Sequence, residues 1–286
     1  MKTKILVFVA LLSIAFFTSC NNEPVNDGAT SSKITTDEVV ANSEIDATVD
    51  DVSSIAEDQF DMQKSSGAKT SSGMKSILPL CANVTVVLTN DTYTRTIDFG
   101  TEGCAMPNGN ILKGKIIISF SKSFASPMRT ISYKLEGFYH NGKLIEGSKT
   151  IINELKTSDL LATIHPVSTH AIDMKVTFPD GKIYTRVGTR VREMIEGFAT
   201  ITNWEDNVFN VWGNHTTTFP NGSTYTSTIK TPLVIKMSCK MPFPVSGVVE
   251  NVKNDSKATL DYGNGDCDKL ATVTINGVTK EIILRK

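Results

Sequence analysis

The sequence predicts an all-β fold, a long-stranded antiparallel meander preceded by a short acidic helical segment. Three observations predict it. From residue 77 to residue 286, runs rich in Val, Ile, Thr and Tyr alternate with turn dipeptides. Six of those dipeptides are Asn-Gly or Asp-Gly. Residues 35–63 differ from the rest of the chain, because their apolar side chains recur at helical spacing.

The turn dipeptides predict tight hairpins. Asn-Gly and Asp-Gly favour positive φ at both positions, which a type I′ turn requires. The runs on either side are long, as where residues 130–139 return as residues 143–152. Such strands predict a meander of roughly a dozen strands. The six pairs are Asn108-Gly109, Asn141-Gly142, Asp180-Gly181, Asn221-Gly222, Asn264-Gly265 and Asn276-Gly277.

One face of this sheet is predicted to be apolar. Ile131, Tyr133 and Leu135 alternate with Ser132 and Lys134, so the two sets lie on opposite faces. The apolar face must be covered by curling of the sheet, by a second sheet or by the N-terminal helix. A curled sheet or incomplete barrel is the first expectation, and a sandwich is the second.

Residues 1–19 have the pattern of a lipoprotein signal peptide. Two lysines begin the segment, and residues 5–17 are apolar apart from one serine, a run too short to span a bilayer as a helix. Small residues directly precede Cys20, as in the lipobox of bacterial lipoproteins, where the cysteine becomes the first mature residue and carries acyl chains such as palmitate. An ordinary secretory signal cut near Ser19 is the alternative.

The mature chain then divides into four parts. Residues 20–34 are rich in Asn, Ser, Thr and Asp and predict a flexible tether. Residues 35–63 predict one or two short amphipathic helices, residues 64–76 a Ser/Gly/Lys linker, and residues 77–286 the antiparallel β domain.

The helical segment is strongly acidic. Thr35 and Glu38 fit a capping box at its start. Nine Asp or Glu and no Lys or Arg lie between Lys33 and Lys64. We expect the acidic face to be solvated, because scattered charges of one sign usually keep a helix wet; a face that holds a cation or a basic partner is the alternative. The apolar stripe consists of Ile45, Val49, Val52 and Ala56, with Ile55 beside it.

Four cysteines follow Cys20, an even number in a chain predicted to be exported. Three pairings are possible, and the local one is preferred: Cys81 with Cys104, and Cys239 with Cys267. Each bond would stabilise the fold by roughly 3 kcal/mol.

The two ends of the β domain carry a related motif. Asp98-Phe99-Gly100 precedes Cys104 at the spacing at which Asp261-Tyr262-Gly263 precedes Cys267. This Cys…Asp-aromatic-Gly…Cys arrangement resembles a group of uncharacterised lipoproteins from Bacteroidota. The resemblance covers the lipobox, the acidic helix and both ends of the β domain. It implies an outer-membrane lipoprotein, on the periplasmic face or at the cell surface, and implies no activity.

The loop from Asp261 to Asp268 is the candidate metal site. Asn264, Asp266 and Asp268 alternate along the chain, and oxygen ligands of this kind suit Ca²⁺. The spacing of an EF-hand is absent. A tight hairpin favours the same residue types, so a structural turn is the preferred interpretation, and no other cofactor is expected.

No catalytic motif is present. Neither H-E-x-x-H nor G-x-S-x-G occurs, and the four histidines are scattered. Trp204 and Trp212 flank an acidic turn, where they could stack on a sugar or a partner, although a place in the core is preferred. The histidines are His140, His165, His170 and His215.

The net charge of −1 gives no basic excess that would attract nucleic acid. We therefore expect a lipid-anchored envelope protein whose non-catalytic β domain binds an envelope macromolecule, glycan or lipid, or has a structural role. The alternatives are a periplasmic carrier, which would hold a lipid or another hydrophobic ligand in its curled sheet, and a hydrolase without a recognisable motif.

Overall fold

The computed structural model describes residues 33–66, 75–200 and 203–284. One helix, α1 (Thr36–Ser66), precedes a sheet of fourteen strands. The strands are β1 (Asn83–Thr89), β2 (Thr92–Asp98), β3 (Cys104–Ala105), β4 (Ile111–Ser121), β5 (Met128–His140), β6 (Lys143–Lys156), β7 (His165–Thr177), β8 (Ile183–Glu196), β9 (Val208–Thr218), β10 (Thr224–Lys236), β11 (Ser246–Lys253), β12 (Ser256–Asn264), β13 (Leu270–Ile275) and β14 (Val278–Ile283). Two short 3-10 helices are η1 (Trp204–Asp206) and η2 (Met237–Cys239).

All the strands belong to one antiparallel sheet. The strands follow one another in chain order from β1 to β14, and only the short β3 lies off this path, paired with β4. Among the described residues β1 and β14 do not pair, so the sheet is open and has two edges. The predicted meander is confirmed, and the sandwich is not formed because there is a single sheet.

Three of the predicted type I′ turns have a different geometry. Only Asn141-Gly142 and Asn276-Gly277 have positive φ at both residues. At Gly109, Gly181 and Gly222 the glycine alone has positive φ. A proline stands two residues before each of these glycines, and its ring fixes a negative φ that favours a type I turn followed by a left-handed glycine.

The remaining pair, Asn264-Gly265, does not form a tight turn between paired strands. Asn264 ends β12, and residues 265–269 lead to β13. The N–H of Gly265 donates to the carbonyl of Val245, which precedes β11, at 2.9 Å. Instead, the hairpins β1–β2 and β11–β12 turn at Asn90 and Asn254, which both adopt positive φ without a following glycine.

The acidic segment forms one helix of 31 residues, longer than predicted. No Gly or Pro interrupts it. The predicted capping box is present, since Thr35 N–H donates to Glu38 at 2.9 Å and Glu38 N–H donates to the Thr35 hydroxyl at 3.3 Å. After the helix, Ser76 and Ile77 return to it by donating to the carboxylate of Asp58.

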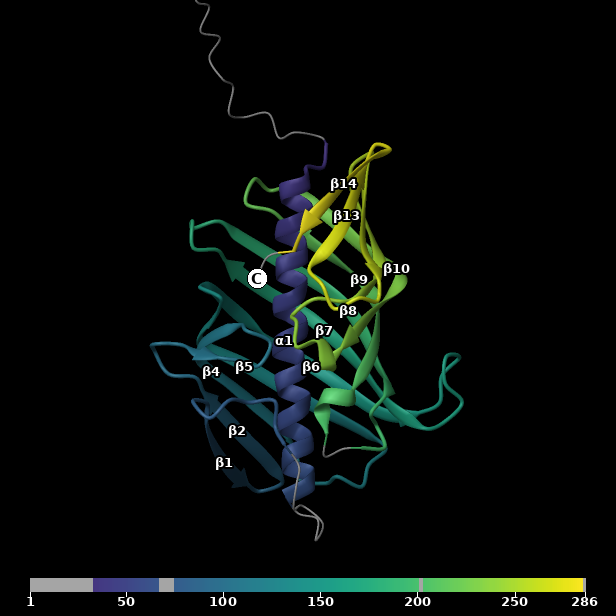
Figure 1. Cartoon of the computed structure of the whole chain (residues 1–286). Helices are drawn as coiled ribbons and strands as arrows, with labels where there is room; N and C mark the ends of the chain where they lie inside the picture. The colour runs from purple at the N-terminus through teal and green to yellow at the C-terminus, as the bar shows by residue number, and fades with distance from the viewer. Residues whose placement is uncertain (1–32, 67–74, 201–202, 285–286) are drawn as a thin grey trace, which may run out of the picture. The chain divides into compact units, whose positions relative to one another are not determined.

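The sheet curves around this helix, which lies along its inner face (Figure 1). The predicted alternation is confirmed on β5, where Ile131 and Tyr133 are buried and Ser132 and Lys134 are exposed. The inner side chains of the strands and the apolar stripe of α1 form one core. All five residues of that stripe are fully buried, so the helix provides the cover that the apolar face needs.

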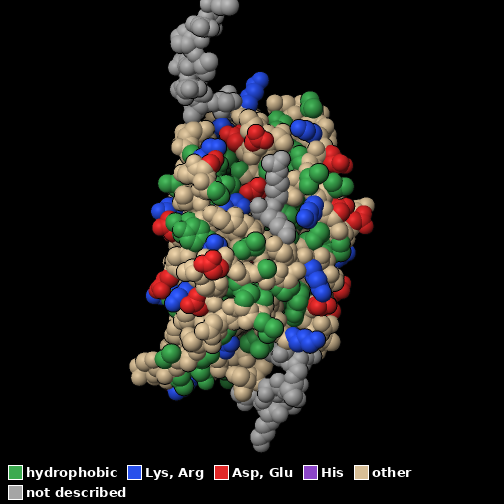
Figure 2. All heavy atoms as spheres, turned by 60° about the vertical axis from the view of Figure 1, so that its left-hand side comes forward, with side chains coloured by type: hydrophobic (Ala, Val, Ile, Leu, Met, Phe, Trp, Pro, Cys, Tyr) green, Lys and Arg blue, Asp and Glu red, His purple; other side chains and the backbone are tan. Residues whose placement is uncertain are grey.

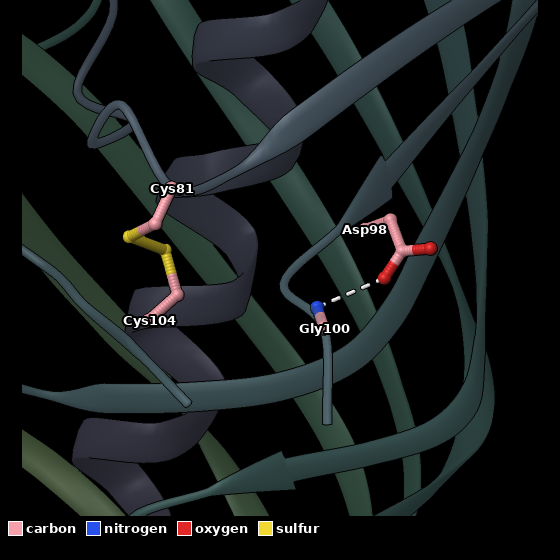
Figure 3. Close-up of a disulfide and its surroundings, with 4 residues drawn as sticks. All are labelled: Cys81, Asp98, Gly100 and Cys104. Carbon is pink, nitrogen blue, oxygen red and sulfur yellow. Dashed lines mark hydrogen bonds between the residues drawn. A yellow bond between two sulfur atoms is a disulfide. The ribbon is translucent and has the colours of Figure 1, made fainter. Parts of the chain in front are cut away.

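Both predicted disulfides are present. Cys81 is bonded to Cys104, and Cys239 is bonded to Cys267. The related motifs beside them adopt the same turn: Gly100 N–H donates to Asp98 Oδ1 at 2.9 Å (Figure 3), and Gly263 N–H donates to Asp261 Oδ1 at the same distance. The two ends of the domain therefore match in local structure as well as in sequence.

The predicted signal peptide, Cys20 and most of the predicted tether lie outside the described residues. Ile34, the last residue of that tether, is buried, and its N–H donates to Ser256 at 3.1 Å. No helix within the described ranges is long and apolar enough to cross a membrane.

Candidate ligand-binding site

The inner face of the sheet is basic where α1 packs on it. Arg186 and Arg190 of β8 are fully buried, and both donate to Oδ1 of Asp46 on the helix. Arg190 also binds Asp50 at 2.6 Å. The expectation of a solvated acidic face is therefore wrong. The helix holds a basic partner instead, and that partner is the chain's own sheet.

These ion pairs set the charge state of the buried carboxylates. Burial alone would raise the pKa of Asp46, but attraction to Arg186 and Arg190 outweighs burial and lowers the pKa to about 2. The pKa of Glu57 is set in the same way. Burial would raise it, but Arg192 at 2.5 Å and His170 at 3.2 Å lower it to about 2. Both carboxylates are ionised at neutral pH. Asp46 therefore supplies a negative charge to Arg186 and Arg190, and Glu57 supplies one to Arg192.

Polar contacts continue along the whole helix. Asp51 lies 3.0 Å from His140 Nε2, and Thr48 lies 3.2 Å from the other ring nitrogen. Because these groups are buried, each contact fixes the rotation and the register of α1 against the sheet. Further contacts join Asn42 to Ser227 and Asn251, Glu44 to Lys143, Glu38 to Lys253, and Gln59 and Gln63 to Arg95.

Lys149 is 3% exposed, and among the described residues no carboxylate lies within ion-pair distance of its ammonium. Its ammonium donates to the hydroxyl of Ser53 at 2.7 Å. Burial lowers the pKa of Lys149 to about 7, although Asp50 and Glu57 oppose the shift. The unfolded chain therefore binds the proton more tightly than the folded protein does, and protonation of this lysine favours unfolding.

Lys149→Met is accordingly expected to stabilise the protein at neutral pH by a few kcal/mol. The gain should shrink as the pH rises from about 7 toward the ordinary lysine value of 10.5, because the unfolded lysine also becomes neutral there. Urea unfolding of both proteins at several pH values measures the difference. Lys280→Met, on exposed β14, is the control and should show no such dependence. A Lys149→Met protein that is less stable than wild type at pH 7 would contradict this account.

Each histidine is buried beside a carboxylate from a distant part of the chain. His165 lies 2.6 Å from Glu193, and His215 lies 3.6 Å from Asp46. Burial lowers the pKa of His215 well below its usual value and that of His170 to about 4, so both rings are neutral at pH 7. These pairs leave no local signal in the sequence because most of the partners lie on α1, about 90 or more residues away in the chain.

One of these pairs includes a serine. Ser158 donates to the same Glu193 oxygen that faces His165, and its own oxygen accepts from the N–H groups of Leu160 and Leu161 at 3.1 Å. In a catalytic triad the histidine lies between serine and acid, because it must take the proton of the serine. Here the glutamate lies between them. This cluster links the loop between β6 and β7 to Glu193 on β8, and its order of residues differs from that of a catalytic triad.

A pocket opens where α1 meets the loops at one end of the sheet. Asp50, Asp51 and Ser54 line it from the helix. Its cavity volume is about 50 Å³, which is room for a small chemical group, and it is open to solvent. Its other walls are mainly apolar and contain three methionines, whose flexible side chains adapt to the shape of a ligand. These walls are formed by Ile77, Met106, Pro107, Asn108, Trp204, Ile235, Met237, Lys240, Met241, Pro242 and Phe243.

The two aspartates give this pocket its polar character. Asp51 accepts from Asn108 at 2.7 Å, and Asp50 is held by Arg190. The cation of the pocket, Lys240, is bound to Glu205 at 3.1 Å. The site therefore combines a wall of methionine and aromatic groups with two carboxylates, of which Asp51 is bound by Asn108, Asn110 and His140, and Asp50 by Arg190.

Both tryptophans are half-buried, so neither lies fully in the core as preferred from the sequence. Trp204 is part of the pocket wall, whereas Trp212 is not. The sequence signal for the pocket was weak, because its residues come from five separate segments and are joined only by folding.

The candidate calcium loop holds its carboxylates in turns. Asp261 accepts from Gly263 and Asp268 accepts from Leu270, each at 2.9 Å, and these two residues line a solvent-open hollow of about 450 Å³ with Asn264 and Asp266. Within the described ranges no three His, Cys, Asp or Glu side chains gather as a metal site requires. The Ca²⁺ hypothesis gains no support from this geometry.

No protein-family model matches the chain, and comparisons with curated proteins and with solved structures return no match. The site must therefore be interpreted from its own chemistry.

Proposed function

We propose that the chain is an exported, lipid-anchored envelope protein whose β domain binds a ligand without catalysis. The apolar pocket beside Asp50 and Asp51 is the observation that carries the binding role. Its ligand would present an apolar group with a cationic or hydrogen-bond-donating end, such as an amine or a basic side chain of an envelope component. No histidine lines this pocket, so no imidazole is placed there for general acid–base chemistry.

The interior of the sheet argues against the carrier alternative. A carrier needs an open apolar cavity on the inner face, and α1 occupies that face with 15 buried residues and buried ion pairs. Two disulfides support the predicted export, because such bonds persist in oxidising compartments. The lipobox before Cys20 supports the anchor.

Trp204 provides a direct test of ligand binding. Trp212→Phe leaves Trp204 as the single tryptophan, so its fluorescence reports on the pocket wall. We expect a short alkylamine to shift this emission at lower concentration than the matching alcohol, and the matching carboxylate to bind weakest. The reverse variant, Trp204→Phe with Trp212 kept, should not respond. Equal responses to all three compounds, or none, would contradict the proposed site.

The anchor is tested separately. Cells given labelled fatty acid should incorporate the label into the wild-type protein, which should sediment with membranes. Cys20→Ser should abolish the label, while substitutions in the pocket should leave it unchanged. A Cys20→Ser protein that is still acylated and processed would refute lipid anchoring at Cys20 and would leave the proposed ligand binding unaffected.

A further inference from the structure

The edge strand β1 lacks the features that usually protect an edge. Its seven residues, Asn-Val-Thr-Val-Val-Leu-Thr, carry no charge and no proline. Its register with β2 is unbroken over all seven pairs, so no bulge turns the edge away. The side chains of Val86, Val87 and Leu88 are 44%, 57% and 50% exposed. An uncharged, regular and apolar edge is a template for pairing with another strand.

The hydrogen bonds of β2 show which backbone groups of β1 remain available. Asp91 accepts from Lys122, and Phe99 donates to Gly114, so odd-numbered residues along β2 direct their backbone groups toward β4. Even-numbered residues of β2 therefore bond β1, and their partners on β1 are odd-numbered. Val84, Val86 and Leu88 consequently direct their N–H and C=O groups away from the sheet.

We propose that two copies of this chain pair through β1 in antiparallel register, with Val86 opposite Val86 of the second copy. In this register Val84 faces Leu88. The residues whose N–H and C=O groups point away from one sheet therefore lie opposite the same kind of residue in the other copy, as an antiparallel ladder requires. The remaining pairs, Thr85 with Val87 and Asn83 with Thr89, place no charge opposite a like charge. About six new backbone hydrogen bonds form across the two-fold axis.

The opposite edge lacks this self-complementarity. On β14 the N–H of Leu284, the residue after the strand, donates back to Lys269, so the outward residues are odd-numbered. The equivalent two-fold register would place Glu281 opposite Glu281, and Lys280 lies beside it. The face turned forward in Figure 2 shows mainly hydrophobic side chains and tan surface, which is backbone or uncharged side chains, in its lower middle. Because each copy has one such edge, the assembly closes as a dimer.

The test uses the whole mature chain with Cys20→Ser, which keeps it free of lipid. Sedimentation velocity up to roughly 100 µM should show a reversible monomer–dimer equilibrium. Val86→Pro removes an outward N–H without touching the β1–β2 ladder, and it should leave a folded monomer. Glu281→Pro makes the matched change on β14 and should leave the dimer intact.

A second variant tests the same interface without a proline, because a proline could itself cause misfolding. Val87→Lys adds a charge to an exposed position of β1 and should weaken the dimer at least about tenfold while the thermal midpoint of the monomer stays the same. A wild-type protein that remains monomeric over the whole range would overturn the proposal. So would a dimer that survives both β1 variants or one that is lost in Glu281→Pro.

Discussion

Replacing Asp46 with asparagine is expected to lower the free energy of unfolding by about 3 to 5 kcal/mol. Asp46 is 3% exposed, and its carboxylate is shared by two buried guanidinium groups, those of Arg186 and Arg190. The variant keeps the shape of the side chain but leaves these cations short of a negative charge. Urea unfolding at neutral pH, followed by circular dichroism, measures the loss.

The same carboxylate contributes to acid sensitivity. Its pKa is about 2 in the folded protein and 3.8 ordinarily, so its stabilising effect is complete above that ordinary value and is lost as the pH falls toward 2. Asp173→Asn, on the exposed face of β7, is the control and should change stability by less than about 0.5 kcal/mol. If Asp46→Asn destabilises a protein that carries Arg186→Met and Arg190→Met by the same amount, the buried pairing is not the cause.

Removing the second disulfide is expected to have an effect of similar size. The bond between Cys239 and Cys267 joins residues 28 positions apart, and replacing both with serine should lower the free energy of unfolding by about 3.5 kcal/mol. Cys239 lies directly before Lys240 and Met241 in the pocket wall, so the amine response of Trp204 should weaken in the same variant. Urea unfolding and the fluorescence titration measure the two effects.

The control for this experiment is Cys20→Ser, which removes a cysteine that takes no part in the bond. It should unfold at the same urea concentration as the wild-type β domain. A loss below about 1 kcal/mol in the Cys239→Ser, Cys267→Ser variant would contradict the stabilising role. A normal amine response with reduced stability would instead show that the disulfide stabilises the fold but is not needed for the pocket to bind the amine.

Local features of this fold were predictable because their causes lie within a few residues. The capping box of Thr35 and Glu38 joins positions three apart, and the alternation on β5 follows from the pleat of a strand. The turns at Gly109, Gly181 and Gly222 were also within reach of the sequence. The proline before each of them excludes positive φ at the first turn position, so the Pro-Asn-Gly and Pro-Asp-Gly triplets indicate a type I turn.

The burial of the acidic helix was not predictable from the helix alone. Asp46 binds Arg186, which lies 140 residues further along the chain, and nothing in the helical segment indicates this ion pair. A signal was present on β8, where Arg186, Arg190 and Arg192 occupy alternate positions on the same face as buried Tyr184. Three arginines on the core-facing side of a strand require buried counter-charges, and the helix is the acidic segment of the chain.

The pocket was the feature that was least predictable from the sequence. Its methionines, Met106, Met237 and Met241, are unremarkable in sequence, and they meet only because two loops converge on the middle of α1. Their convergence depends in turn on the ion pairs that fix the helix against the sheet.

Amide hydrogen exchange of α1 tests the central claim most directly, since that claim places the acidic helix inside the curved sheet. The buried amides from Asn42 to Phe60 should exchange only when the whole domain unfolds, with the same free energy of opening as the central strands β7 and β8. Exchange of this helix within the range expected for a solvated, isolated helix, while the strands remain protected, would show that α1 does not lie in the sheet.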